Sequence, residues 1–346
     1  RDQYVVVYGN MLFYAPNNDY RYEYFCNLSE YAGGNYYSQA YQFGDMVYVF
    51  PQSAEHILAI DLNKSIRRIE LKHECEQQDA FVGAFVYDDH VYILPGRYSA
   101  LIRFDPKTEN VEYLPDIGPF NFGMVNNENT LCARAYQNGK LFFLGVTGEQ
   151  LLIVDLKTMK TEVVATKFEK TYMVMTPEKD ISDVFWLLPF EGTSLTKWNY
   201  RTGEMQEYDL YVDGLKSYYA GQQNVECDNR YFSSLAITDD TVYAAPLWGN
   251  MFVKLDIKSG RAERWRNPFE VAMAKPEGYS PSWTVGFLLR YRENDRKYYF
   301  YYEPLRKSYE IDLHTGKTTE IQQTFQREDL LTHAPGFAKE SQWMQY

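Results

Sequence analysis

The sequence predicts an all-β protein assembled from one sheet module that repeats along the chain. Runs rich in β-branched and aromatic residues recur at intervals, each run ends at a proline or glycine, and a polar residue follows at a fixed distance. Such runs are strand signatures. Tyrosine contributes 32 of the 346 residues and phenylalanine 21, a composition that suits half-buried pleated surfaces.

The break and the polar residue after it define the repeat. They stand ten positions apart in six copies and eight apart in the seventh: Pro16/Cys26, Pro51/Asp61, Pro95/Asp105, Gly145/Asp155, Pro189/Asn199, Pro246/Asp256 and Pro304/Asp312. Successive breaks are separated by 35 to 58 residues. Because the repeated runs have strand chemistry, this loose period excludes helical solenoids.

Most copies contain the parts of a four-stranded antiparallel sheet. A tight polar turn joins the first two strands, as in YVVVYGNMLFYA (4–15) and ARAYQNGKLFFL (133–144), and Asn-Gly and Asp-Asp turns are hairpin signals. The third strand follows the break, as in ILAI (57–60) and LIRF (101–104). The fourth follows the polar residue, as in VEYL (111–114) and TEVVA (161–165).

The polar residue is interpreted as the cap of the turn between the third and fourth strands. In DPKTEN, DLKTMK, NYRTGE, DIKSGR and DLHTGK an Asp or Asn side chain can accept backbone N–H groups two or three residues on, and Gly or Asn supplies the left-handed position. A metal-binding or acid–base role is disfavoured for these regularly spaced carboxylates. Replacing Asp105 or Asp256 with alanine should therefore lower stability and leave ligand affinity intact.

This pattern resembles that of β-propellers over the whole length. The resemblance is to WD-repeat-like and kelch-like architecture and not to one family, because the Trp-Asp ending of WD repeats is missing and proline stands where kelch repeats have a glycine pair. It implies a single domain over residues 1–346 with seven four-stranded blades, or six as the alternative. The first copy lacks a fourth strand, since Leu28 leads through SEYAGGN into the next copy. The segment Ser341 to Tyr346 is predicted to complete that blade and close the ring, so its deletion should lower the melting temperature.

Charge and composition exclude several classes of partner. The net charge of −12 repels polyanions, so nucleic acid is not a predicted partner. No apolar run is long enough to insert into a membrane, which predicts a soluble protein. Since the sequence begins at Arg1, it fits either a cytoplasmic protein or an exported one whose leader has been removed.

No cofactor or metal is predicted. The four cysteines are far apart and form no metal-binding pair. Cys26 and Cys132 fall in strand-like runs and are interpreted as core residues. Cys75 and Cys227 fall in predicted loops.

Candidate ligand-binding residues lie on the loops between the second and third strands and between blades. The resemblance implies that these loops share the face at the mouth of the central channel, and here they are long and rich in aromatic and amide residues. The candidates are Tyr20, Arg21, Glu55, His56, Arg97, Tyr98, Glu191, Tyr219, Trp248, Trp283 and Arg306. Arg97 and Arg306 each follow a strand-ending proline by two residues, which favours an anionic group. The alternative is that these side chains pack their own loops, or that the arginines pair with acids such as Glu55 and Glu149.

No catalytic residue is predicted, because no nucleophile, phosphate-binding or dinucleotide motif is present. The leading hypothesis is a non-enzymatic binding propeller for a glycan, a peptide, a protein or a small molecule. The alternative is a carbohydrate-active hydrolase or lyase with scattered acid and base residues, and a third idea is a scaffold that bridges proteins. Convergence of two carboxylates, or of a histidine and a carboxylate, would favour the enzyme. The oligomeric state is left open.

Overall fold

The computed structural model divides into two compact units, formed by Arg1–Phe122 with Gln322–Tyr346 and by Gly123–Ile321. It describes residues 3–7, 10–16, 21–72, 80–114, 117, 120, 122–125, 128–178, 181–217, 230–246, 249–265, 297–302, 307–312, 315, 317–321 and 324–325.

The first unit begins with two groups of strands that share one eight-stranded sheet. Its order is β29-β3-β2-β1-β4-β5-β6-β7, and a single residue pair, Val5 with Gln39, joins β1 to β4. The bounds are β1 Gln3–Val7, β2 Met11–Ala15, β3 Arg21–Asn27, β4 Tyr37–Phe43, β5 Met46–Pro51, β6 His56–Asp61 and β7 Ile66–Glu70. In place of a fourth strand after β3 stands the short helix α1, Ser29–Ala32, which agrees with the sequence prediction for the first copy.

The outer edge of β3 is covered by β29, Thr324–Phe325, which pairs with it in parallel through Arg21 and Tyr22. The segment predicted to complete the first blade, Ser341 to Tyr346, lies outside the described residues. An extended segment from late in the chain therefore adds to β3, and the role of Ser341 to Tyr346 in closing the ring stays a prediction.

The next sheet of the first unit has the order β11-β10-β9-β8, with strands β8 Phe81–Tyr87, β9 His90–Pro95, β10 Leu101–Phe104 and β11 Val111–Leu114. A hairpin follows it, β12 Phe122–Val125 with β13 Glu128–Leu131. The sequence predicts a loop between blades at this point, and the structure has this hairpin there.

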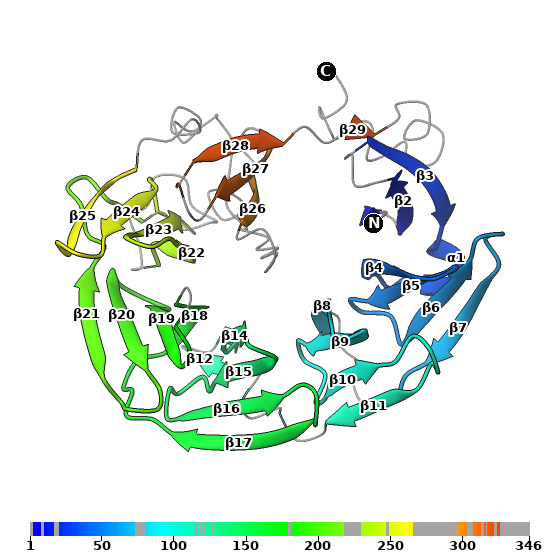
Figure 1. Ribbon diagram of the computed structural model, residues 1–346, viewed down its shortest axis with the longest axis horizontal. Helices are drawn as coiled ribbons and strands as arrows, with labels where there is room; N and C mark the ends of the chain where they lie inside the picture. The colour runs from blue at the N-terminus through cyan, green and yellow to red at the C-terminus, as the bar shows by residue number, and fades with distance from the viewer. Residues whose placement is uncertain are drawn as a thin grey trace. The chain divides into compact units, whose positions relative to one another are not determined.

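The second unit repeats the four-stranded pattern in two sheets that run in chain order from β14 to β17 and from β18 to β21, and in a third from β22 to β25 (Figure 1). The bounds are β14 Ala133–Gln137, β15 Lys140–Leu144, β16 Gln150–Asp155, β17 Lys160–Ala165, β18 Tyr172–Pro177, β19 Val184–Pro189, β20 Ser194–Asn199, β21 Met205–Asp209, β22 Phe232–Ile237, β23 Thr241–Pro246, β24 Val253–Asp256 and β25 Arg261–Arg264. Three strands of a further sheet are described, β26 Lys297–Tyr302, β27 Lys307–Asp312 and β28 Thr318–Ile321.

The core lies between the faces of successive sheets. Phe50 and Ile57 pack with Ile93 and Phe104 of the next sheet in the first unit. In the second unit Trp186 and Leu195 pack with Val242 and Val253 of the following sheet. The middle strands are therefore buried on both faces, which explains why β19 reads VFWLLP with every residue buried.

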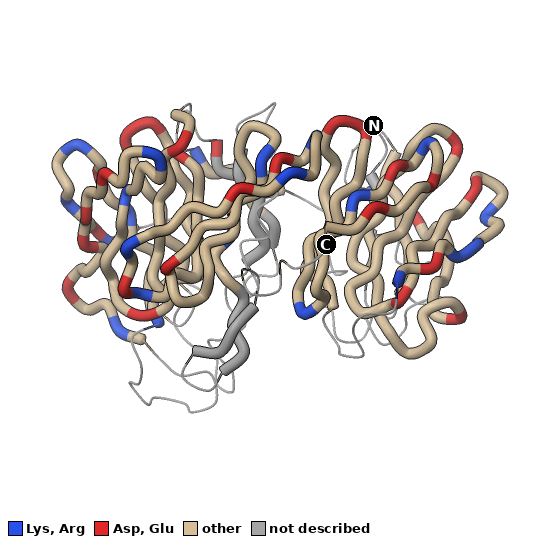
Figure 2. Tube along the Cα trace, turned by 90° about the horizontal axis from the view of Figure 1, so that it is seen from below, with Lys and Arg blue, Asp and Glu red and all other residues tan. Residues whose placement is uncertain are grey.

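Charged residues of both signs alternate along the described strands and turns (Figure 2). In the part of the chain that the structure describes, no helix has the length and apolar character needed to cross a membrane.

The turn after the third strand is capped as predicted. Asp105 accepts the Lys107 N–H at 2.9 Å and the Thr108 hydroxyl at 2.7 Å, and Asp155, Asn199, Asp256 and Asp312 make the same kind of contact. The left-handed position differs from the prediction in two turns, where it is Glu109 (φ 59°) and Met159 (φ 55°) and not Asn or Gly. These bonds hold the pKa of Asp105 below its usual range, with the Thr108 hydroxyl the largest cause.

Replacing Asp105 with alanine is expected to lower the free energy of unfolding by about 1 kcal/mol, because the turn loses the acceptor of two hydrogen bonds. Urea denaturation of the full chain measures the change. Asn63, which is exposed in the equivalent turn between β6 and β7 but is not its capping residue, supplies the control through Asn63→Ala. Equal stability of Asp105→Ala and the unmodified chain would contradict the capping role.

Candidate functional site

A groove with a volume of about 840 Å³ lies along the outermost strand of the β18–β21 sheet in the second unit. Four segments line it: Lys170, residues 191–194, residues 206–209 of β21, and residues 257–260 in the turn between β24 and β25 of the neighbouring sheet. One strand edge and a turn from the next sheet therefore form its walls.

Along β21 the backbone N–H and C=O groups of successive residues point alternately toward β20 and toward the groove. The Leu210 N–H donates to the Thr193 carbonyl at 2.9 Å, and the Asn199 N–H donates to the Glu204 carbonyl at 2.9 Å. Because hydrogen-bonded pairs alternate along an antiparallel ladder, Met205, Glu207 and Asp209 direct their backbone groups away from β20. Among the described residues no strand pairs with that side of β21.

One face of the groove carries a polar network. The Lys170 ammonium lies 3.9 Å from a carboxylate oxygen of Glu207 and 3.4 Å from the Ser194 hydroxyl. The Thr193 hydroxyl donates to Asp209 Oδ1 at 2.6 Å, and the Tyr211 N–H donates to the same oxygen at 2.9 Å. These bonds orient donors and acceptors along the strand.

The opposite face is built around Tyr208. Its ring packs against Trp186 with centroids 5.3 Å apart, and a Cβ placed on Gly260 would lie 3.9 Å from the Tyr208 ring. Burial raises the pKa of Tyr208, so its hydroxyl is protonated at neutral pH. Since side chains on successive residues of a strand point to opposite faces, Glu207 and Tyr208 line the groove from both sides of β21. The groove therefore follows the strand edge and not one face of the sheet.

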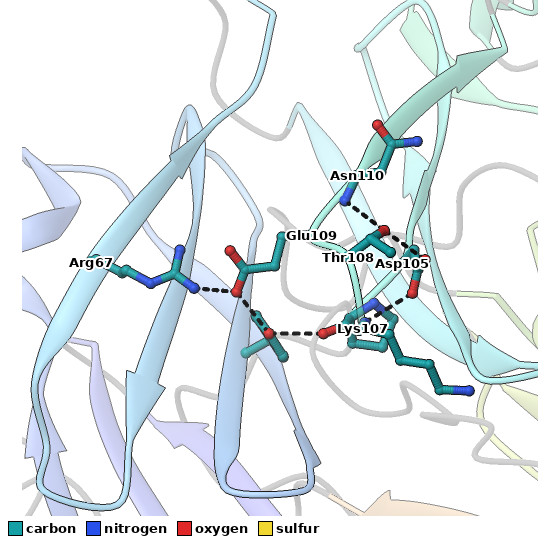
Figure 3. A network of polar contacts seen from close by, with 8 residues as sticks. Arg67, Asp105, Lys107, Thr108, Glu109 and Asn110 are labelled. Atoms are coloured by element: carbon teal, nitrogen blue, oxygen red, sulfur yellow. Dashed lines mark hydrogen bonds and ion pairs between the residues drawn. The ribbon is translucent and has the colours of Figure 1, made fainter.

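At two other junctions between successive sheets, an ion pair joins the fourth strand of one sheet to the turn between the third and fourth strands of the next. In the first unit Arg67 of β7 bonds Glu109 in the turn of the next sheet, and Glu109 also accepts the Tyr48 hydroxyl at 2.9 Å (Figure 3). In the second unit Arg201 donates to both carboxylate oxygens of Glu162, at 2.7 and 3.2 Å.

At the junction between β21 and the next sheet, the described residues form no such ion pair. Its turn carries Lys258 at the position of Arg201 and Gly260 at the position of Glu109, counted from the capping residue. Within the described chain no ion pair joins β21 to this turn. Gly260 has no side chain to fill the space beside Tyr208.

Among the sequence-predicted residues, Glu191 lines the groove and its side chain is exposed. Arg21 is exposed at the start of β3, where its backbone pairs with Thr324. Tyr20, Tyr219, Trp248, Trp283 and Arg306 lie outside the described residues. The remaining candidates belong to the first unit and are not among the residues that line the groove.

Glu55, Arg97 and Tyr98 lie on the loops between second and third strands in the first unit. These loops form backbone hydrogen bonds with the segments that connect successive sheets. The Leu71 N–H donates to the Glu55 carbonyl, and the Tyr98 N–H donates to the Ala80 carbonyl, so the loops between second and third strands meet the loops between sheets as predicted. Tyr98 is buried, with its hydroxyl donating to the Lys72 carbonyl at 2.8 Å, whereas Glu55 and Arg97 are exposed. Ligand contacts by these three residues stay a prediction.

His56 is buried beside Tyr37. Its Nε2 lies 2.5 Å from the Tyr37 hydroxyl, and the Tyr37 N–H donates to Asn10 Oδ1 at 3.0 Å. Burial is the main cause that lowers the pKa of His56, and the Arg68 guanidinium adds to it, whereas Glu70 and Glu55 oppose it. The imidazole is therefore neutral at pH 7, and a ligand contact by His56 stays a prediction.

The stability of the protein is expected to fall as the pH drops below about 6.5, the usual pKa of histidine in an unfolded chain. Below that pH the unfolded chain protonates His56 while the folded chain, whose His56 pKa is lowered, resists protonation. Urea midpoints measured from pH 7.5 to 5.5 for the unmodified chain and for His56→Gln check this. A smaller loss in the variant supports the account, and identical losses contradict it.

Comparisons with known proteins report structural likeness alone. No family model matches the chain, and no curated protein matches its sequence. A structure of Hsv2 from Kluyveromyces lactis is 9% identical, covers 92% of this chain and 94% of its own, and superposes with a TM-score of 0.51. The fold is a β-propeller. Virginiamycin B lyase from Staphylococcus aureus (13% identity, 82% of each chain, TM-score 0.46) and the Pan2 WD40 domain from Neurospora crassa (8% identity, 83% and 79%, TM-score 0.43) are further similar structures.

Sequence reasoning missed most of the groove because it placed the ligand site on the long loops of one propeller face. The groove instead uses Lys170, the outer strand 206–209 and the short turn 257–260. One signal was available, since the turn DIKSGR combines lysine and glycine at the positions where other turns place side chains that pair with the preceding blade. The described residues contain no cluster of histidine, cysteine, aspartate or glutamate with the geometry of a metal site.

Proposed function

We propose that this chain is a non-enzymatic binding propeller that holds an extended ligand or partner segment in the groove along β21. The observation that carries the proposal is the lining of the groove from both faces of a sheet-edge strand, by Glu207 on one side and Tyr208 on the other. A ligand lying there meets the backbone groups of three residues as well as the side chains on both walls. The proposal keeps the sequence prediction of a single domain over residues 1–346.

The side chains of the groove suit a polar chain such as a glycan or a peptide. Lys170, Ser194 and Thr193 supply donors, Glu191, Glu207 and Asp209 supply acceptors, and Tyr208 supplies an aromatic ring. A shallow groove with several directed polar groups favours recognition of a segment over enclosure of a compact small molecule.

A thermal-shift screen of the full chain against short peptides and oligosaccharides, followed by affinity measurements on the hits, tests the proposal. Lys170→Ala is expected to weaken an oligosaccharide bound in the groove by about tenfold, equivalent to about 1.4 kcal/mol, because it removes a hydrogen-bond donor. Lys160→Ala on β17, which is exposed and away from the groove, is the matched control and should leave affinity unchanged. An oligosaccharide that binds both variants as tightly as the unmodified chain would have its site elsewhere.

The second candidate is a carbohydrate-active hydrolase or lyase, and one observation favours it: three carboxylates, Glu191, Glu207 and Asp209, line the same groove. Glu191, which is also a candidate from the sequence, is the first of these carboxylates to replace. Turnover of any oligosaccharide hit that is abolished by Glu191→Gln while its binding persists would favour the enzyme.

A further inference from the structure

The first unit contains an example of a strand edge that accepts an added segment. The outer side of β3 pairs in parallel with β29, through Thr324 opposite Arg21 and Phe325 opposite Tyr22. β21 is the fourth and outermost strand of its own sheet, and within the described residues no segment covers it. An unpaired strand edge is a template for an added strand.

The groove at β21 has the dimensions and chemistry for an added strand. Met205, Glu207 and Asp209 direct their N–H and C=O groups outward at every second residue, a spacing that matches the repeat of an extended peptide. A glycan has hydroxyl groups in irregular directions and does not reproduce this ladder. The strand edge therefore favours a peptide over a sugar.

The charges of the groove favour a basic peptide. Glu191, Glu207 and Asp209 outnumber Lys170 and Lys258 among the lining residues, and the whole chain carries a net charge of −12. Side chains of an added strand alternate between the wall of Glu207 and the wall of Tyr208 and Ile257. Basic residues fit the first wall and β-branched residues the second.

We infer that the groove takes an extended, basic peptide segment of a protein partner as a fifth strand on β21, an inference that rests on the proposed function. Backbone hydrogen bonds to Glu207 and its neighbours supply affinity, and the alternating walls supply specificity. Binding weakens as salt rises, because part of the attraction is between exposed charges.

The probe is a fluorescein-labelled peptide of about eight residues that alternates lysine with valine or threonine, long enough to span the strand at about 3.3 Å per residue. Fluorescence anisotropy with the full chain measures its binding. The same peptide N-methylated at every second residue cannot donate the backbone bonds and should lose about tenfold or more in affinity. This arm changes nothing in the protein, so it does not depend on how any variant folds.

Glu207→Pro is the matching change in the protein. It removes an outward N–H and leaves the bonds between β20 and β21, since proline is tolerated on the outer side of an edge strand. Val163→Pro makes the same change at an outward position of β17, away from the groove, and should bind the probe like the unmodified chain. Glu207→Gln keeps the N–H and removes the charge, so its effect should be smaller than that of Glu207→Pro and should vanish at high salt.

The inference is supported if N-methylation and Glu207→Pro both weaken the probe while Val163→Pro does not. It is overturned, with the proposed function intact, if an oligosaccharide binds in a Lys170-dependent manner and the peptide does not. It is also overturned if Glu207→Pro abolishes self-association of the chain and the probe does not bind, since the edge then pairs with a second copy. If no peptide loses affinity with Glu207→Pro and no oligosaccharide loses affinity with Lys170→Ala, the proposed function fails as well.

Discussion

Replacing Trp186 with alanine is expected to lower the free energy of unfolding by about 4 kcal/mol, the usual cost of removing a large buried aromatic side chain. Trp186 is fully buried in β19, in the core shared with the next sheet of the second unit. Its ring packs against Tyr208, and its indole N–H donates to a carboxylate oxygen of Glu178. Denaturation of the full chain in guanidinium chloride, followed by circular dichroism, measures the loss.

Two further variants separate packing from hydrogen bonding at this site. Trp186→Phe keeps an aromatic ring but leaves the Glu178 carboxylate without its indole donor, so we expect a loss of about 2 kcal/mol. Met205→Ala, at an exposed position of β21, should change stability by less than about 0.5 kcal/mol. If Trp186→Ala lost less stability than Trp186→Phe, the packing account would be contradicted.

Replacing Glu178 with alanine is expected to cost about 3 kcal/mol, because it leaves a partly buried ammonium and a buried indole N–H without their acceptor. The side chain of Glu178 is 7% exposed and that of Lys197 26%, and their charged atoms lie 2.8 Å apart. Lys197 also lies over the Trp186 ring at 5.1 Å. The same denaturation experiment measures the change.

The pair Glu178→Leu with Lys197→Met provides the control for this ion pair. Removing both charges together leaves no uncompensated ion but still leaves the Trp186 indole N–H without its acceptor, so the double variant should recover part of the stability that Glu178→Ala loses. A double variant less stable than the single one would show that the ion pair itself stabilises the fold beyond the cost of burying it.

The repeat and its strands were predictable because they rest on local chemistry. The runs MVYVF, KLFFL and VFWLL, at residues 46–50, 140–144 and 184–188, became middle strands buried between sheets, as β-branched and aromatic residues dictate. The capping of the turns at Asp105 and Asp256 was equally local, because each side chain bonds its own backbone neighbours.

The left-handed turn residues were harder to predict because distant contacts decide them. Glu109 takes a strained backbone conformation where Gly or Asn is expected, and its side chain bonds Arg67 and Tyr48 from the preceding sheet. The contacts across the junction offset the backbone strain. No local pattern in DPKTEN indicates that Glu109 takes the left-handed position.

The candidate site was only partly predictable for the same reason. Glu191 was proposed from its loop and does line the groove, but Lys170, Tyr208 and Gly260 come from three separate segments whose meeting depends on how two sheets pack. Burial of His56 and Tyr98 likewise follows from tertiary contacts with Tyr37 and Lys72. Sequence alone placed these residues on loops and left their partners open.

The central claim is that ligand binds along the edge of β21. Hydrogen–deuterium exchange of the full chain, with and without a saturating amount of the lysine–valine peptide, tests it most directly. The account predicts slower exchange of the outward amides of Met205, Glu207 and Asp209, with residues 161–165 of β17 unchanged. Slower exchange confined to residues 96–101, with residues 205–209 unaffected, would contradict it and return the site to the loop face that contains Arg97.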